Sequence, residues 1–154
     1  MNRVNRAILF LPGVLLVLLA LSCARKQASG PEEAAVRSLL EHYFATWSAQ
    51  DMDAYGACFH ESARITFLPD RSGQVITETL TDFLHGQRMG HKTSATPMRE
   101  TAESIDIQGD GRAALARVRW KLVKEDKIVT GIDHFSLVKT PAGWKIAHLL
   151  FYAD

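Results

Sequence analysis

The sequence has little of several residue types on which whole classes of proteins depend. It contains two cysteines among 154 residues, which excludes a disulfide-stapled scaffold and a zinc site with four cysteine ligands. Its 18 Lys and Arg nearly balance its 17 Asp and Glu, so it lacks the clustered basic excess of a nucleic-acid-binding domain. None of its six histidines has a partner at the spacing of a metal motif, and we expect no metal and no cofactor. The 47% of hydrophobic residues indicates one folded domain.

The first 22 residues have the pattern of a secretory signal. Arg3 and Arg6 precede residues 7–21, which contain no charged residue. This apolar stretch is short for a membrane span, which needs about 20 residues, and an uncleaved anchor is the alternative. Residues 19–23 resemble a bacterial lipobox, which implies cleavage after Ser22 and lipidation of Cys23. The residue after Cys23 is Ala24, which resembles the residue at this position in lipoproteins sorted to the outer membrane. We therefore expect an exported lipoprotein anchored in the outer membrane and facing the periplasm.

The chain therefore divides into three parts. We expect a signal peptide at 1–22, a lipidated cysteine with a polar tether at 23–31, and a domain at 32–154. Cys58 is then the only ordinary thiol, and its apolar neighbours Ala57 and Phe59 indicate a buried side chain without a catalytic role.

The first half of the domain is predominantly helical. Pro31 and the acidic pair Glu32 and Glu33 are typical of a first helical turn. Apolar residues then recur at three- and four-residue spacing, as on one face of a helix: Val36, Leu39, Leu40, Tyr43, Phe44 and Trp47. Asp51 can cap a second, short helix. A strand at 63–68, a turn at 69–73 and a helix at 79–89 follow.

The second half has the pattern of a meander. Turn residues separate four expected strands at 98–108, 113–123, 128–139 and 144–152. In the second of these, apolar residues alternate with Arg117, Arg119 and Lys121. The apolar face needs a cover, and the N-terminal helices can supply it. We expect an α+β domain, in the order α-α-β-α-β-β-β-β, whose curved antiparallel sheet wraps around the helices.

This order resembles the nuclear transport factor 2-like superfamily, also called cystatin-like or SnoaL-like, over the whole expected domain. The resemblance rests on four short sequence segments: residues 43–47 before 51–54, residues 59–63 at the first strand, residues 132–135, and residues 143–146. The lumazine-binding and ketosteroid-isomerase-like branches are the most similar in style. The resemblance implies a cone with a ligand-sized cavity, and it does not by itself imply an activity.

Comparison with ketosteroid isomerase, which the resemblance includes, indicates candidate catalytic residues. In that enzyme a Tyr and a protonated Asp form the oxyanion hole, and a second Asp moves the proton. Tyr43 and Asp133 match the first pair. The proton-transfer base falls near Phe67, which cannot accept a proton. Asp70 and His148 are the candidate substitutes, with His148 expected on the face of Trp144, Ile146 and Leu150.

Two roles are compatible with Asp133, which shares its expected strand face with apolar residues. It is either a pocket residue or a structural hydrogen-bond acceptor, because a buried carboxyl is costly unless it is paired or protonated. Tyr43 is either a core tyrosine or a ligand contact. By resemblance, the residues expected to line the cavity and bind a ligand are Tyr43, Trp47, Phe67, Trp120, Asp133, Phe135 and Phe151.

Two functions follow from these candidates. The missing base favours an envelope domain that binds a small apolar or amphipathic ligand, or a protein partner, without catalysis. The alternative is an isomerase or dehydratase in which Tyr43 and Asp133 polarise a carbonyl and a substituted base moves the proton. Members of the superfamily commonly pair through the outer sheet face. The resemblance therefore implies a homodimer, and no nucleic-acid partner is expected.

Overall fold

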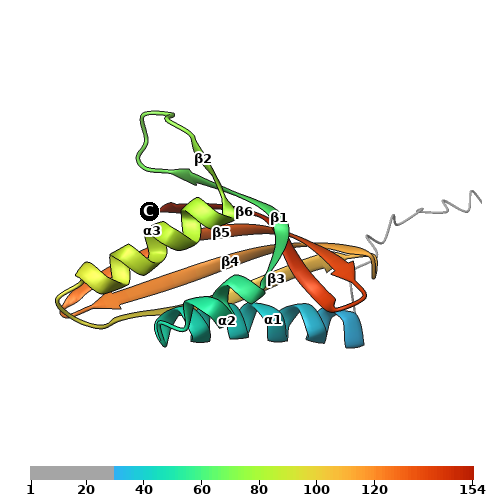
Figure 1. Ribbon diagram of the computed structural model, residues 1–154. Helices are drawn as coiled ribbons and strands as arrows, with labels where there is room; N and C mark the ends of the chain where they lie inside the picture. The colour runs from blue at the N-terminus through green and yellow to red at the C-terminus, as the bar shows by residue number, and fades with distance from the viewer. Residues whose placement is uncertain (1–29) are drawn as a thin grey trace, which may run out of the picture.

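The computed structural model of the protein describes residues 30–154. The expected signal, Cys23 and most of the expected tether lie outside these residues. Figure 1 shows the elements in chain order. They are α1 (Pro31–Ser48), α2 (Met52–Ala57), β1 (Phe59–Leu68), β2 (Ile76–Thr79), α3 (Leu80–Thr93), β3 (Met98–Gly109), β4 (Ala113–Lys124), β5 (Lys127–Thr140) and β6 (Gly143–Ala153). Within 30–154, no helix combines the length and the hydropathy that a membrane crossing needs.

The three helices begin where the sequence predicts. Pro31 opens α1, where its missing N–H is no loss, and Glu32 and Glu33 lie in the positive first turn. Asp51 caps α2 by accepting a hydrogen bond from the Ala54 backbone N–H at 3.0 Å. Thr79 caps α3 in the same way, from the N–H of Asp82 at 3.2 Å. These two caps satisfy backbone N–H groups that are otherwise free at the starts of α2 and α3.

The α+β class is confirmed, and the sheet is mixed rather than purely antiparallel. Its six strands lie in the order β2-β1-β6-β5-β4-β3, and β1 pairs with β6 in parallel. Strand β2, which the sequence analysis did not predict, pairs with β1 and forms the hairpin that projects in Figure 1. Its four residues are too few for a recognisable alternation, so the pairing with β1 rather than the local pattern defines it.

Two bulges change which side chains face the helices. The register of β3 shifts between Ala102 and Ser104. A second shift places Ser136 opposite His148 but Leu137 opposite Ile146, so Ala147 is the extra residue of β6. Each extra residue reverses the alternation of inward and outward side chains along its strand.

The expected face of His148 is therefore wrong. Trp144, Ile146 and Leu149 are buried on the inner face of β6. His148 is only half-buried, on the outer face, where its Nε2 lies 3.2 Å from the Thr66 hydroxyl. The bulge at Ala147 explains this placement, because alternation without it would have put His148 on the inner side with Trp144 and Ile146.

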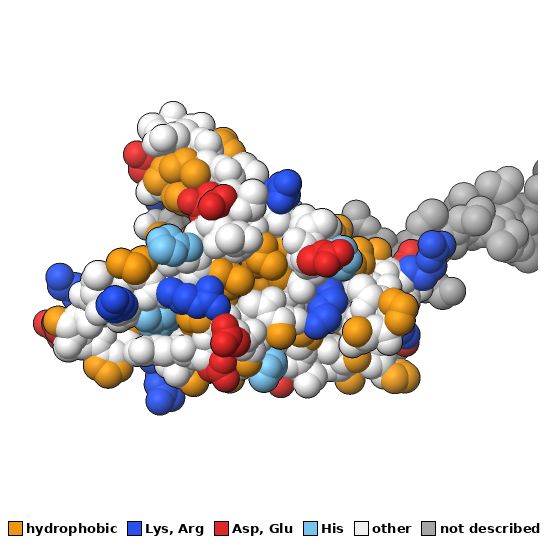
Figure 2. Space-filling view, in the orientation of Figure 1, with side chains coloured by type: hydrophobic (Ala, Val, Ile, Leu, Met, Phe, Trp, Pro, Cys, Tyr) orange, Lys and Arg blue, Asp and Glu red, His pale blue; other side chains and the backbone are white. Residues whose placement is uncertain are grey.

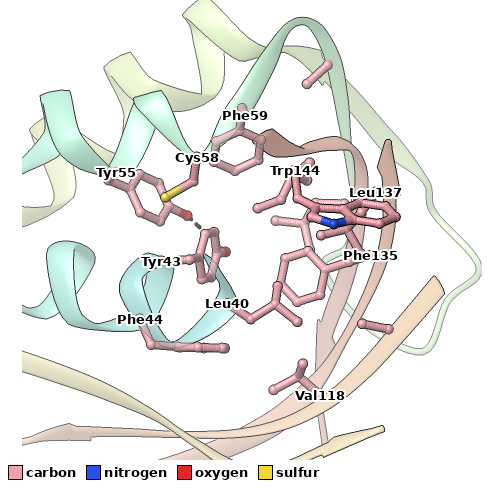
Figure 3. Packing of buried hydrophobic residues seen from close by; sticks show 14 of the residues in the cluster. Leu40, Tyr43, Phe44, Tyr55, Cys58, Phe59, Val118, Phe135, Leu137 and Trp144 are labelled. Carbon is pink, nitrogen blue, oxygen red and sulfur yellow. Dashed lines mark hydrogen bonds between the residues drawn. The ribbon is translucent and has the colours of Figure 1, made fainter. Parts of the chain in front are cut away.

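A single core fills the space between the helices and the sheet. Figure 3 shows its central members, with Leu40 and Tyr43 of α1 facing Val118 and Phe135 of the sheet. Cys58 is buried there, as expected, and burial raises the pKa of its thiol to about 11. The core is apolar toward the start of α1 and contains polar side chains toward its end.

Candidate functional site

A small pocket lies under the C-terminal half of α1. Its volume is about 170 Å³, close to the roughly 150 Å³ of an engineered cavity that binds benzene. Seven elements contribute to its wall, which consists of Tyr43, Trp47, Tyr55, Phe83, Gln87, Glu100, Trp120, Leu122, Asp133, Leu149 and Phe151. Its size suits one or two rings and is too small for a steroid-sized molecule without rearrangement.

Five of the seven expected ligand-binding residues line this pocket: Tyr43, Trp47, Trp120, Asp133 and Phe151. The other two lie behind the wall. Phe67 stacks on Phe151, with ring centroids 5.6 Å apart, and Phe135 meets Tyr43 edge-on at 5.3 Å. Phe67 and Phe135 therefore hold lining side chains in place rather than facing the pocket themselves.

Tyr43 is paired with Tyr55, a contact drawn in Figure 3. The Tyr55 hydroxyl donates to the Tyr43 hydroxyl oxygen at 2.9 Å. Burial is the main cause that raises the pKa of Tyr43 well above its ordinary value, and the neighbouring acidic groups raise it further. The Tyr43 hydroxyl therefore keeps its proton. Because Tyr43 accepts from Tyr55, its own hydrogen is available to a ligand in the pocket.

Asp133 is the most deeply buried carboxyl of the site, at 3% exposure. Burial raises its pKa well above the ordinary value, and the nearby Glu100 raises it further. The Trp120 indole N–H lowers the pKa of Asp133, yet this N–H is buried without a well-formed hydrogen bond to any described residue. The surroundings of Asp133 thus favour its protonated form over the carboxylate.

Glu100 is the second carboxyl of the pocket, and it is not among the site residues predicted from the sequence. It lies on β3 opposite Leu122 with its side chain half-buried, and the loss of surrounding water raises its pKa to about 7. The Ser48 hydroxyl fixes its backbone, since it donates to the Glu100 carbonyl and accepts from the Glu100 N–H, each at 2.9 Å. Met98, Glu100 and Ala102 alternate on one face before the bulge, and this alternation was the available signal.

Trp120 is positioned by a glycine on the neighbouring strand. Gly131 lies opposite Trp120 in the β4–β5 register. A Cβ on Gly131 would lie 2.2 Å from Cζ2 of the indole ring and 2.2 Å from the Tyr152 carbonyl oxygen. Trp120 therefore rests directly on the bare backbone of β5, which gives the pocket one of its flat walls.

The two candidate bases named from sequence lie elsewhere. Asp70 is exposed in the turn after β1, where its carboxylate accepts from the Ser72 N–H at 2.7 Å and its pKa is lowered. His148 is on the outer face of the sheet. The structure brings neither to Tyr43 and Asp133, and it places Glu100 there instead. Residues 30–154 contain no group of three or more His, Cys, Asp or Glu side chains arranged to hold a metal ion.

Fold and pocket together define the class of protein: a cystatin-like, or nuclear transport factor 2-like, α+β cone with a small internal pocket. The chain belongs to the family described as "Putative lumazine-binding", which matches residues 31–152. No curated protein matches the chain.

Solved structures show the same fold at low sequence identity. A protein of unknown function with a cystatin-like fold from Nostoc punctiforme is 13% identical, with 83% of this chain and 95% of that chain covered and a TM-score of 0.68. A protein of unknown function from Mycobacterium tuberculosis is 21% identical, with 82% and 78% covered and a TM-score of 0.66. A "Putative Scytalone Dehydratase" from Novosphingobium aromaticivorans is 18% identical, with 80% and 84% covered and a TM-score of 0.67.

Proposed function

We propose that the domain binds a small, flat molecule in the pocket between Tyr43, Trp120 and Phe151. The observation that carries this proposal is the pair of carboxyls, Glu100 and Asp133, in a pocket whose other walls are aromatic. Aromatic faces favour a planar ligand, and the few polar groups would fix its orientation. A carboxyl removed from water is costly to stability, and side chains with raised pKa values concentrate at functional sites.

The family description supports a heterocyclic ligand. A lumazine is a planar, two-ring heterocycle that carries both carbonyl and N–H groups. The pocket offers the Tyr43 hydroxyl as a donor to a carbonyl, and the two carboxyls as acceptors or donors according to their protonation. Its volume of about 170 Å³ suits a molecule of that size.

The experiment is a calorimetric titration of the purified domain with lumazine. We expect saturable binding, which Trp120→Phe weakens because it shrinks the flat wall over Gly131. Trp144→Phe is the matched control, since Trp144 lies outside the pocket and donates to Glu32 at 2.9 Å. Absence of binding by lumazine and by smaller single-ring compounds would overturn the proposal.

A second candidate is an isomerase or dehydratase, and Glu100 is the observation that favours it. With a pKa of about 7, this carboxyl is suited to act as a general base at neutral pH. As a carboxylate it would take a proton from the carbon beside a substrate carbonyl. Hydrogen bonds from Tyr43 and protonated Asp133 would stabilise the enolate oxygen. In an isomerisation, Glu100 returns the proton to a more distant carbon of the substrate. In a dehydration, Glu100 gives the proton to a hydroxyl group of the substrate, which leaves as water.

Proton exchange tests this candidate without knowledge of the substrate. A small cyclic ketone such as cyclohexanone, incubated in D₂O with the domain, should exchange its α-protons faster than in buffer, and Glu100→Gln should remove the acceleration. Exchange at the buffer rate with the unaltered domain would leave ligand binding as the function.

The proposed location is the outer membrane, through a lipid on Cys23. The support is the lipobox-like pattern of residues 19–23 behind an apolar stretch. Cys23→Ser should stay unprocessed or leave the membrane fraction, as mass spectrometry and fractionation would show. An unchanged mass and unchanged fractionation would contradict lipidation.

The proposed assembly is a homodimer through the outer face of the sheet. A shallow groove of about 1260 Å³ reaches this face, where Leu115 is exposed beside Arg117 and His134. Because charged side chains border this face, the association should weaken with salt. Light scattering that reports a monomer at high protein concentration and low salt would contradict the dimer.

A further inference from the structure

The pocket contains two acidic groups without a positive counterpart. Glu100 and Asp133 line it, and none of its lining residues is Lys, Arg or His. No positively charged residue of the described chain lowers the pKa of either carboxyl. Acids at the surface are different, because acidic and basic side chains are interspersed there, as on the face shown in Figure 2. Asp53, for example, pairs with Arg88 at 2.7 Å. An ionised carboxyl without a partner is strongly unfavourable away from water. The pocket therefore lacks a positive charge that would stabilise its carboxyls in their ionised form.

The remaining walls are suited to a positive charge. Trp47, Trp120 and Phe151 present aromatic rings, and such rings attract a cation over their faces, tryptophan most strongly. Trp47 is held by its indole N–H, which donates to the Gln87 amide oxygen at 2.8 Å. Trp120 is held against Gly131. Acidic groups inside a fixed aromatic wall recognise an organic cation by both charge and shape.

We propose that the ligand of this pocket is a small planar cation, an amidinium or a protonated nitrogen heterocycle, whose N–H groups donate to Glu100 and Asp133. This inference rests on the proposed function and names the chemical class of the ligand. The cation supplies the missing counter-charge, and its flat body lies among the aromatic side chains. A neutral ligand of the same shape would leave the carboxyls unpaired or protonated.

Binding of a cation is coupled to proton release. The titratable groups that face the pair are Tyr43 from α1 and Tyr55 from α2, and both keep their protons because their pKa values are raised. Helix α3 and strands β4 and β6 contribute uncharged lining residues. Because Glu100 titrates at about 7, a cation that needs it ionised should bind more tightly as the pH rises.

Two compounds of the same shape test the inference. Benzamidine is a planar cation, and benzamide is its neutral counterpart. Calorimetry with the domain should show benzamidine binding at least about tenfold more tightly than benzamide near pH 8. From about pH 6 to about pH 8, the benzamidine affinity should rise up to about tenfold, as expected for one proton released from a group of pKa about 7. The benzamide affinity should stay constant or fall.

Variants assign the effect to the carboxyl pair. Glu100→Gln should lower benzamidine affinity about tenfold or more and remove its pH dependence, while benzamide binding is retained. Asp133→Asn should also weaken the preference for the cation, which keeps the test open if one variant folds poorly. Glu61→Gln is the matched control, because Glu61 is an exposed carboxylate on β1.

The outcomes separate this inference from the proposed function. Equal or tighter binding of benzamide near pH 8 would overturn the cation inference and leave ligand binding in place. Cation preference that survives both Glu100→Gln and Asp133→Asn would overturn it too, because the preference would arise outside the pair. Failure of both compounds and of lumazine to bind would overturn the proposed function itself.

Discussion

The two ends of the cone are built differently although the same elements form both. Toward the start of α1, Val36 and Leu40 pack in a wholly apolar core with side chains such as Val118 and Ile146. Toward the end of α1, the same strands bring Glu100 and Asp133 into the interior. The first end consists of closely packed apolar side chains, as is typical of a stable core. The second end holds a buried carboxyl, Asp133, and a half-buried one, Glu100, without a basic partner, and such departures from core packing are common at functional sites.

The largest effect should come from the apolar end. Leu40 has 0% exposure, and Leu40→Ala should lower the free energy of unfolding by about 2–5 kcal/mol through lost burial and a cavity. Urea denaturation monitored by circular dichroism measures this free energy. Leu115→Ala, on an exposed position of β4, should change stability by less than about 0.5 kcal/mol. Similar losses for the two variants would contradict the described core.

An intermediate effect is expected where the pocket meets the backbone. Gly131→Ala would place a methyl group 2.2 Å from the Trp120 ring and the Tyr152 carbonyl. Relief requires movement of the indole and of β6, at a cost of about 1–3 kcal/mol. Gly86→Ala is the control, since a Cβ there meets nothing within 4 Å. A thermal melt that shows Gly131→Ala to be no less stable than the unaltered domain would contradict the position of Trp120.

The smallest effect, and the one of unusual sign, is expected at Asp133. Its folded-state pKa is raised, so its contribution to stability is complete below the unfolded value, near 3.8, and is lost as the pH rises through the folded value. Asp133→Asn removes that loss. At pH 7 the variant should be as stable as the unaltered domain or slightly more stable, and its relative stability should increase with pH.

Melting temperatures at about pH 5, 7 and 8.5 test this sign. Asp106→Asn, which removes an exposed carboxylate from β3, is the control. A fall of several degrees for Asp133→Asn at pH 7 would show an ionised acceptor with charge-assisted hydrogen bonds, which contribute about 1.5–3 kcal/mol each. The pocket assignment of Asp133 would then be wrong.

Much of the fold could be predicted because its local patterns are strong. The apolar spacing from Val36 to Trp47 allowed prediction of α1, and turn residues separated the four long strands to within about two residues. The short strand β2 and the parallel pairing of β1 with β6 depend on contacts between segments far apart in sequence. Local periodicity contains no information about such contacts.

The site was only partly predictable, for a specific reason. Tyr43 and Asp133 could be named because a family pattern and an apolar strand face coincide there. Glu100 and His148 depend on bulges, near Glu103 and at Ala147, which reverse the alternation of each strand. Alternation counted back from Ile105 and Ile107 puts Glu100 on the surface, against its alternation with Met98 and Ala102, and the pairing register is needed to resolve the conflict. Alternation counted from Trp144 and Ile146 puts His148 in the interior.

The central claim is that the pocket raises the pKa values of both of its carboxyls, Glu100 and Asp133. The most direct measurement is a titration of the side-chain carboxyl carbons by ¹³C NMR, with Glu100→Gln and Asp133→Asn used for assignment. The account predicts that Glu100 titrates near pH 7 and that Asp133 remains protonated well above its ordinary 3.8. Titration of Glu100 near its ordinary 4.5, together with Asp133 ionised at about pH 5, would contradict it.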